Sequence, residues 1–425
     1  MWRQLVGIVL VVVLVSGCHG IATGAHQTSV KTMDRITPHS PRVVGTASRS
    51  QDAGLPHTKP TRVVELGALP ELDAILPRLA KKRVIFIGET HTRLADHLNQ
   101  LAIIQGLWAQ GKTLAIGMES FQQPFQSHLD DFIAGNTDDA TELLARTEYY
   151  ERWRYDYRLY QPILDFAREQ KIPLIALNVS SELVKKVSEN GWDALVRDNT
   201  LTKEERAQLP QTIDRSNRAY EERLREVFRQ HGAIDRKASS DMKEGKEKHQ
   251  KRGVTDFGRF MDVQLLWDEG MAKRAAEYVA EHPSVTLIVL AGSGHLVHGD
   301  GIPDRLRKRV DVDTAIVLPV GAETDVDMAD FLLVSEERLL PPAGRLGILL
   351  EKNAEVASFM AESAARDAGI ELQDRIRSID KRPIASLADI KLALWNKRPG
   401  DRVSVQVHRT HWITEKDLRF EVRLR

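Results

Sequence analysis

Five short apolar runs, rich in β-branched and other aliphatic residues, recur along the middle of the chain. They cover Arg83–Ile87, Thr113–Met118, Ile172–Leu177, Val285–Ala291 and Thr314–Pro319. These runs are continuous in apolar residues rather than alternating, which is typical of strands buried on both faces of a parallel sheet. Apolar residues between the runs recur at helical spacing. The pattern therefore predicts an α/β fold with a mainly parallel sheet flanked by helices.

Helices are predicted over Leu69–Ala80, from Leu94 to Trp108, and around Phe125–Ile133. A long helical insertion is predicted between the third and fourth strands. It comprises a charged helix, a polar stretch and an amphipathic helix: Lys203–Gln230, Lys237–Arg252 and Phe257–Ala280. On the amphipathic helix we expect Trp267, Asp268 and Met271 to face the sheet as core residues rather than as ligands.

Polar side chains follow four of the predicted strands. Glu89 and His91 follow the first, Glu119 the second, Asn178 the third and His295 the fourth. The carboxyl ends of parallel strands meet at one edge of a sheet, where ligands of open α/β folds bind. We therefore expect these side chains to converge on one pocket.

Composition describes an ordinary globular protein with no strong charge preference. The chain has 425 residues, of which 42% are hydrophobic, and its 60 Lys and Arg balance its 60 Asp and Glu. Nothing in this balance favours nucleic acid as a partner. The single cysteine, Cys18, rules out an intramolecular disulfide and a Cys-x-x-Cys motif.

The position of Cys18 favours lipidation. Residues 1–17 combine a basic start with an apolar core and end in Ser16 and Gly17, so the stretch resembles a bacterial lipoprotein signal peptide that precedes a lipidated cysteine. His19, rather than aspartate, then favours the outer membrane, facing the periplasm, over the inner membrane. Residues 18–62 are rich in small and polar residues and are predicted to form a disordered tether to the membrane.

The composition changes after a break at Pro341–Gly344, and a second domain is predicted over 344–425. Its strand-like segments and its motifs resemble a bacterial PDZ domain, a small β-sandwich or partial barrel; the motifs are Gly344–Ile348, Ser363–Gly369, Asp374–Asp380 and Pro399–Val403. The resemblance implies that the backbone of Leu346, Gly347 and Ile348 binds the C-terminal carboxylate of a peptide.

Residues 63–335 resemble the ChaN-like lipoproteins, which are related to erythromycin-esterase-like and TIKI-like hydrolases. Seven segments carry the resemblance, in order along the chain: Ile87–His91, Gly117–Ser120, Tyr160–Ile163, Ala176–Asn178, Gln264–Asp268 with Met271–Ala272, Gly292–His295 and Gly301–Pro303. Their spread over the whole domain makes the signal far more specific than one four-residue match.

The ChaN-like resemblance implies a haem-binding lipoprotein of iron acquisition. A tyrosine or histidine is the expected axial ligand, and Glu148–Pro162 is crowded with aromatic residues. We select Tyr160 there, with Asn178 and His298 as further cofactor-binding residues. The haem would be non-covalent, and the sequence leaves open whether a homodimer encloses it.

The hydrolase relatives imply a second function for the same residues. Glu89, His91, Glu119 and His295 would be catalytic, with His91, His295 and Glu119 as ligands of a divalent metal ion. A third reading is a non-catalytic periplasmic adaptor that recruits proteins through the PDZ domain. Whether the chain is an enzyme stays open at this point.

Overall fold

The computed structural model describes residues 65–425 apart from positions 138, 241–255, 322–323 and 412–413. The predictions for residues 1–17, for Cys18 and for the tether over 18–62 lie outside the described residues. Among the helices that are described, none is both long and apolar enough to cross a membrane.

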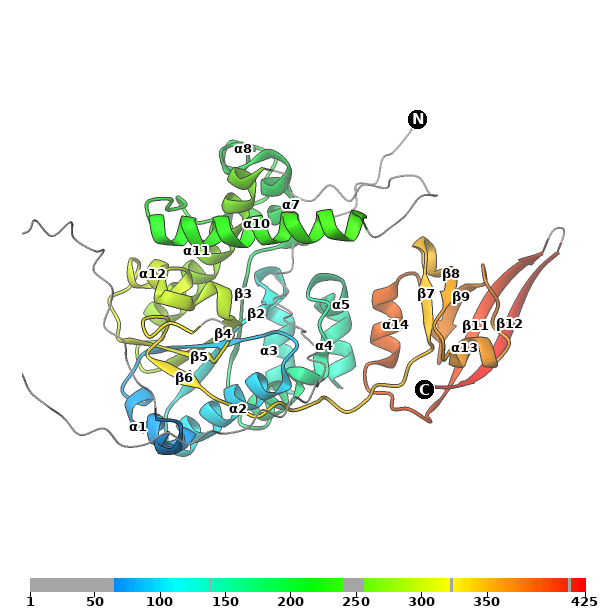
Figure 1. The fold of residues 1–425 in the computed structure, drawn as a ribbon, viewed down its shortest axis with the longest axis horizontal. Helices are drawn as coiled ribbons and strands as arrows, with labels where there is room; N and C mark the ends of the chain where they lie inside the picture. Colours follow the sequence, from blue (N-terminus) through cyan, green and yellow to red (C-terminus); the bar gives the residue numbers. More distant parts are fainter. Residues whose placement is uncertain (1–64, 138, 241–255, 322–323, 412–413) are drawn as a thin grey trace, which may run out of the picture. The chain divides into compact units, whose positions relative to one another are not determined.

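A six-stranded sheet forms the centre of the larger region (Figure 1). Its strands, in spatial order, are β3 (Leu174–Asn178), β2 (Leu114–Gln122), β4 (Thr286–Gly292), β1 (Val84–Glu89), β5 (Thr314–Pro319) and β6 (Phe331–Leu333). Every neighbouring pair is parallel. The predicted α/β fold with a mainly parallel sheet is therefore confirmed.

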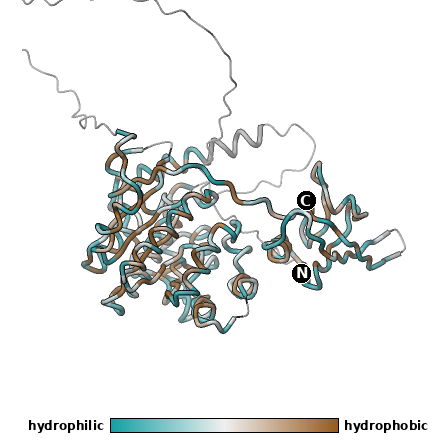
Figure 2. The backbone as a smooth tube through the Cα atoms, turned by 90° about the horizontal axis from the view of Figure 1, so that it is seen from below, coloured by the Kyte–Doolittle hydropathy of each residue, from teal (hydrophilic) through white to brown (hydrophobic). Residues whose placement is uncertain are grey.

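The sheet has helices on both faces. The helices of this region are α1 (Leu76–Leu79), α2 (Leu94–Ala109), α3 (Gln126–Ala134), α4 (Ala140–Arg146), α5 (Tyr149–Arg152), α6 (Gln161–Glu169), α7 (Ser181–Asn190), α8 (Trp192–Val196), α9 (Lys203–Gln208), α10 (Arg218–Ser240), α11 (Phe257–Glu281) and α12 (Ile302–Arg307). Figure 2 shows hydrophobic and hydrophilic stretches alternating along the same helices, as expected of helices with one face on a core.

Two hydrophobic cores lie on opposite faces of the sheet. Along β1 the side chains alternate: Ile85 and Ile87 enter the core under α2 and α6, whereas Val84 and Phe86 enter the core under α11 and α12. This alternation explains why the strand is apolar at every position, since both of its faces are covered.

The observed strands run further toward the site than their apolar runs suggest. We expected Gly88 to end the first strand, but Gly88 and Glu89 continue it and pair with Ala291 and Gly292. A Cβ on Gly88 would lie 2.4 Å from Leu318 Cδ2 and 2.8 Å from Ser293 Oγ. Glycine is therefore needed for close packing rather than for a turn.

The helix predictions hold in part. The expected helix over Leu69–Ala80 is a 3-10 turn, Leu72–Ile75, followed by the single turn α1, with prolines at positions 70 and 77. The charged helix of the insertion is divided into α9 and α10. Proline at position 210 lies between them and cannot donate a backbone hydrogen bond.

The second region consists of antiparallel strands and two helices, consistent with the predicted PDZ domain. One sheet has the order β10 (Arg382–Pro383), β9 (Arg375–Ile379), β11 (Arg402–His411) and β12 (Thr414–Arg423), and the other pairs β7 (Ile348–Leu350) with β8 (Val356–Phe359). The helices are α13 (Ala364–Asp367) and α14 (Leu387–Leu394), and the region has its own hydrophobic core.

Candidate functional site

The carboxyl ends of four adjacent strands bring the predicted residues together. Glu89 at the end of β1 lies opposite Gly292 at the end of β4 in the strand register. Glu119 on β2 accepts a 2.7 Å hydrogen bond from the Gly292 amide through Oε2. Asn178, at the end of β3, donates from Nδ2 to the Glu119 carbonyl oxygen over 3.1 Å. The predicted convergence at one sheet edge is therefore present.

Glu89 is a buried carboxylate with several partners. Oε1 accepts from the Tyr160 hydroxyl over 2.5 Å and lies 2.8 Å from His91 Nδ1, while Oε2 accepts from Gln100 Nε2 over 2.9 Å. Burial acts to raise the pKa of Glu89, but the charges of His97 and His91 and the hydrogen bonds outweigh it and lower the pKa to about 2. The group is thus a fixed negative charge.

His91 is held by this carboxylate through Nδ1, and its opposite ring edge faces β4. A Cβ on Gly292 would lie 2.8 Å from His91 Cε1, 2.9 Å from Nε2 and 3.6 Å from Glu119 Oε2. The missing side chain at Gly292 therefore lets the imidazole lie against the strand, with Nε2 on the side of Glu119. Only glycine permits this approach.

His295 repeats the arrangement from the other side. It follows β4 in a 3-10 turn, and its Nδ1 lies 2.5 Å from Oδ1 of Asp268, a fully buried residue on α11. Its Nε2 lies 3.5 Å from Glu119 Oε1. Two carboxylate–imidazole pairs, Glu89–His91 and Asp268–His295, thus flank the carboxylate of Glu119.

Neighbouring carboxylates raise the pKa of both imidazoles. Burial acts to lower the pKa of His295, but the charges of Asp268 and Glu119 and the Asp268 hydrogen bond outweigh it and raise the pKa to about 9. Burial is likewise outweighed at His91, whose pKa is raised by Glu89 and Glu119. At neutral pH His295 is therefore a proton donor, and its Nε2 faces the Glu119 carboxylate.

An aromatic wall, formed by Trp153 and Tyr155, covers His91. The ring centroid of His91 lies 4.9 Å from that of Trp153 and 4.8 Å from that of Tyr155. The Tyr155 hydroxyl is buried, and within the described residues it has no hydrogen-bond partner. Burial, followed by the charges of Glu119 and Glu89, raises the pKa of this phenol. Among the buried tyrosine hydroxyls without a described partner, this one belongs to a ring that contacts His91.

The three residues predicted to bind a cofactor have different surroundings. Tyr160 is fully buried and its hydroxyl is engaged by Glu89, which fits a role in holding that carboxylate. Asn178 is buried at the site, and its Oδ1 has no partner among the described residues. His298 has an exposed side chain, and its backbone amide donates to the Met328 carbonyl.

The proposed metal ligands His91, Glu119 and His295 do lie together. However, no group of three or more His, Cys, Asp or Glu side chains that could hold a metal ion occurs in the described part of the chain. The geometry is that of an acid–base cluster.

Several residues of the site were not predicted from the sequence. Asp268, expected in the core, instead binds His295, because it lies on the part of α11 beside the His295 turn. His97 and Gln100, one turn apart on α2, both face Glu89. Polar residues at buried helix positions were the available signal. Tyr155 offered no signal that distinguished it from its aromatic neighbours.

The predicted peptide-binding loop lies at the start of β7. Gly347 has a φ of +70°, and a Cβ there would lie 2.6 Å from the Glu362 carbonyl oxygen. Within the described residues, the amides of Leu346 and Gly347 donate no hydrogen bond, and β7 pairs only with β8. One edge of β7 and two adjacent amides are thus unpaired.

Similar solved structures cover each region separately. ChaN of Campylobacter jejuni, described with cofacial haem binding, is 16% identical over 61% of this chain and 90% of its own, with a TM-score of 0.47. An erythromycin esterase, EreC, is 16% identical over 58% and 72%, with a TM-score of 0.33. The HtrA-type protease AlgW with a decapeptide is 23% identical over 20% and 30%, with a TM-score of 0.17.

A search of curated proteins finds no match. Family models match both regions. Residues 344–424 match the PDZ domain. Residues 75–306, more than half of the chain, match the family described as "Haem-binding uptake, Tiki superfamily, ChaN". The chain therefore belongs to the ChaN haem-binding family of the Tiki superfamily, and it carries a PDZ domain after the ChaN domain.

Proposed function

We propose that this protein binds haem against the aromatic wall at His91, as a lipoprotein of haem or iron acquisition. Membership of the haem-binding family gives the ligand class. The observation that carries the proposal is the buried Tyr155 hydroxyl, which has no hydrogen-bond partner in the described residues. The ring centroid of Tyr155 lies 4.8 Å from that of His91.

The residues at this wall fit a porphyrin. Trp153 and Tyr155 offer flat apolar surfaces for a macrocycle, and phenol and imidazole are both known axial ligands of haem iron. Tyr155 would hold the haem iron through its phenol oxygen, and Glu89 holds His91 beside it through Nδ1. When bound, the haem iron would supply a Lewis-acidic centre, to which the phenol oxygen of Tyr155 could donate a lone pair.

Absorption spectroscopy tests the proposal. Haemin is titrated into the full chain, and the Soret band is followed for the wild type, Tyr155→Phe and Tyr149→Phe. Tyr149 is the matched control, because its buried hydroxyl also lacks a partner among the described residues but its ring packs on Phe121 and Tyr157.

We expect Tyr155→Phe to weaken haemin binding by about tenfold or more, roughly 1.4 kcal/mol, and to change the Soret position. Tyr149→Phe should bind as the wild type does. Equal binding by all three proteins would contradict the assignment of Tyr155, and the absence of any Soret change in the wild type would contradict haem binding altogether.

A second candidate function is hydrolysis, which the two carboxylate–imidazole pairs favour. Each ring is oriented through Nδ1, and His295 Nε2 lies 3.5 Å from Glu119, so the cluster contains proton donors beside a carboxylate that could act as a base. Ester and peptide substrates should then be cleaved by the wild type. Glu89→Ala and His91→Ala should abolish that cleavage, and activity retained in both would exclude the cluster as its source.

The PDZ domain is proposed to bind the C-termini of peptides at Leu346, Gly347 and Ile348. The unpaired amides of Leu346 and Gly347 and the unpaired edge of β7 support this, within the described residues. Fluorescence anisotropy with a peptide and its C-terminally amidated form tests it. Loss of binding on amidation is expected, whereas equal binding would contradict carboxylate recognition. Peptide binding without haem binding or hydrolysis would favour the adaptor reading.

We also propose lipid anchoring through Cys18, with the protein in the outer membrane facing the periplasm. The apolar run and the small residues before Cys18 support this proposal. The Cys18→Ser variant should lose incorporation of radiolabelled palmitate and leave the membrane fraction. Membrane retention without label would instead indicate an uncleaved anchor.

A further inference from the structure

Helix α10 of the insertion reaches the His295 side of the site. Tyr220, in its first turn, is fully buried and donates its hydroxyl to Asp268 Oδ2 over 2.6 Å. Asp268 Oδ1 lies 2.5 Å from His295 Nδ1. The two oxygens of one carboxylate thus connect a tyrosine of α10 to the imidazole of the site.

A second residue of α10 contacts the turn that carries His295. Arg223 donates from Nη1 to the Gly294 carbonyl over 3.0 Å and from Nη2 to the carboxylate of Asp300. Gly294 directly precedes His295, and Asp300 lies five residues after it. The guanidinium therefore bridges the two ends of this turn.

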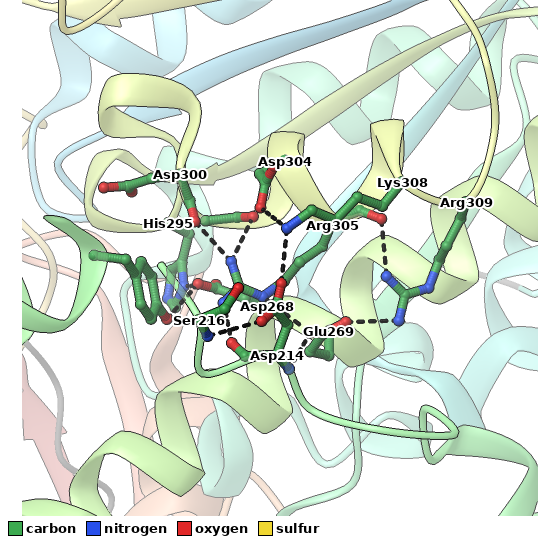
Figure 3. A network of polar contacts seen from close by, with 12 residues as sticks. Asp214, Ser216, Asp268, Glu269, His295, Asp300, Asp304, Arg305, Lys308 and Arg309 are labelled. Carbon is green, nitrogen blue, oxygen red and sulfur yellow. Dashed lines mark hydrogen bonds and ion pairs between the residues drawn. The ribbon is translucent and has the colours of Figure 1, made fainter. Parts of the chain in front are cut away.

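Arg305 contacts the backbone that follows His295, within a larger network of polar contacts (Figure 3). Arg305 on α12 is buried and donates from Nη1 to the carbonyls of Asp300 and Gly301 over 2.6 and 3.0 Å. Its guanidinium lies over the Tyr220 ring, 4.6 Å from the centroid. A Cβ on Gly301 would lie 2.1 Å from the His295 carbonyl oxygen, so the turn packs without free space.

We propose that Tyr220 and Arg223 are positioning residues for His295, and that helix α10 supports this imidazole through them. Tyr220 acts through Asp268, and Arg223 acts through the backbone of the turn. The proposal concerns how His295 is held and is independent of whether the site binds haem or hydrolyses a substrate.

The arrangement has a physical reason. Asp268 is buried, and a carboxylate that accepts from two donors through separate oxygens has little freedom to rotate. Asp268 Oδ2 accepts the hydrogen bond of the Tyr220 hydroxyl, and Oδ1 contacts His295 Nδ1. Without Arg223, the Gly294 carbonyl would lose the hydrogen bond that it accepts from α10.

Proton NMR of the histidine side chains tests the proposal on the full chain. The Nδ1–H of His295, in a short hydrogen bond to a buried carboxylate, should give a downfield resonance that is absent from Asp268→Asn. Its chemical shift and its rate of exchange with water are then compared in Tyr220→Phe, Arg223→Gln and Arg223→Lys. Arg225→Gln is the matched control, because Arg225 lies on the same helix and pairs with Glu221 instead.

We expect Tyr220→Phe to move the resonance and Arg223→Gln to accelerate its exchange by about tenfold or more. Arg223→Lys, which keeps the charge but not the two-armed contact, should also accelerate exchange. Arg225→Gln should leave both quantities unchanged. Thermal melts confirm that each variant is folded. A wild-type shift and exchange rate in Tyr220→Phe and both Arg223 variants would overturn the proposal, and this readout needs neither haem nor substrate.

Discussion

The two halves of the site share one hydrogen-bonding pattern but have different surroundings. In each, a buried carboxylate lies within 2.8 Å of a histidine Nδ1, and Glu119 lies between the halves. The His91 half lies against Trp153 and Tyr155, where a buried phenol has no described partner. The His295 half is enclosed by Tyr220, Arg223 and Arg305, which donate hydrogen bonds to Asp268, to the His295 turn and to the backbone that follows it.

This difference indicates a division of roles. An aromatic wall with an unpaired hydroxyl suits an apolar ligand that brings one acceptor or metal centre. A charged, densely bonded environment instead fixes the protonation state and orientation of His295. We therefore assign ligand contact to the His91 half, and structural support of the central carboxylate to the His295 half.

The largest expected effect is on stability in the His91 half. Glu89→Ala would leave His91, Tyr160 and Gln100 without their common acceptor in a buried site, so unfolding should become easier by about 3–5 kcal/mol. Urea denaturation measures this change. The control is Asp311→Ala, an exposed position, where a change within about 0.5 kcal/mol is expected. Equal effects in the two variants would contradict the central role of Glu89.

A somewhat smaller effect distinguishes the His295 half by its pH dependence. The pKa of His295 is raised from 6.5 to about 9, so its contribution to stability is fully present below pH 6.5 and is lost as the pH rises through 9. Allowing for the partial exposure of the ring, we expect the wild type to lose about 2 kcal/mol over this window. Asp268→Asn should flatten the profile, and an equally steep profile in that variant would exclude the pair as its source.

The smallest effect on stability is expected at the aromatic wall. Tyr155→Phe removes a buried hydroxyl that has no described partner, so without ligand the free energy of unfolding should change by less than about 0.5 kcal/mol. Thermal melts with and without haemin measure it. Haemin should stabilise the wild type more than the variant. A large loss of stability in the variant without ligand would mean that the hydroxyl has a structural partner.

The sequence predicted the sheet and the position of the site well, for a physical reason. Buried parallel strands are apolar at every position, so the strand at Thr314–Pro319 was predicted with its observed bounds. Their polar ends then located Glu89, Glu119 and His295 in one place. Both signals are local in sequence.

The partners of these residues could not be predicted in the same way. Asp268 contacts His295 across 27 positions of sequence, and Tyr220 contacts Asp268 across 48. Both contacts are made through helices whose orientation depends on tertiary packing. The same limit applied to Tyr160, which was selected as an iron ligand but donates its hydroxyl to Glu89. The packing of the helices on the sheet decides which tyrosine hydroxyls have no hydrogen-bond partner among the described residues.

The location of bound iron tests the division of roles most directly. A crystal of the full chain soaked in haemin, with anomalous diffraction collected at the iron absorption edge, gives the position of the metal without prior assumptions. We predict one peak beside the Tyr155 hydroxyl, on the His91 half of the site. A peak beside His295, or a haem that contacts neither Trp153 nor Tyr155, would contradict the account.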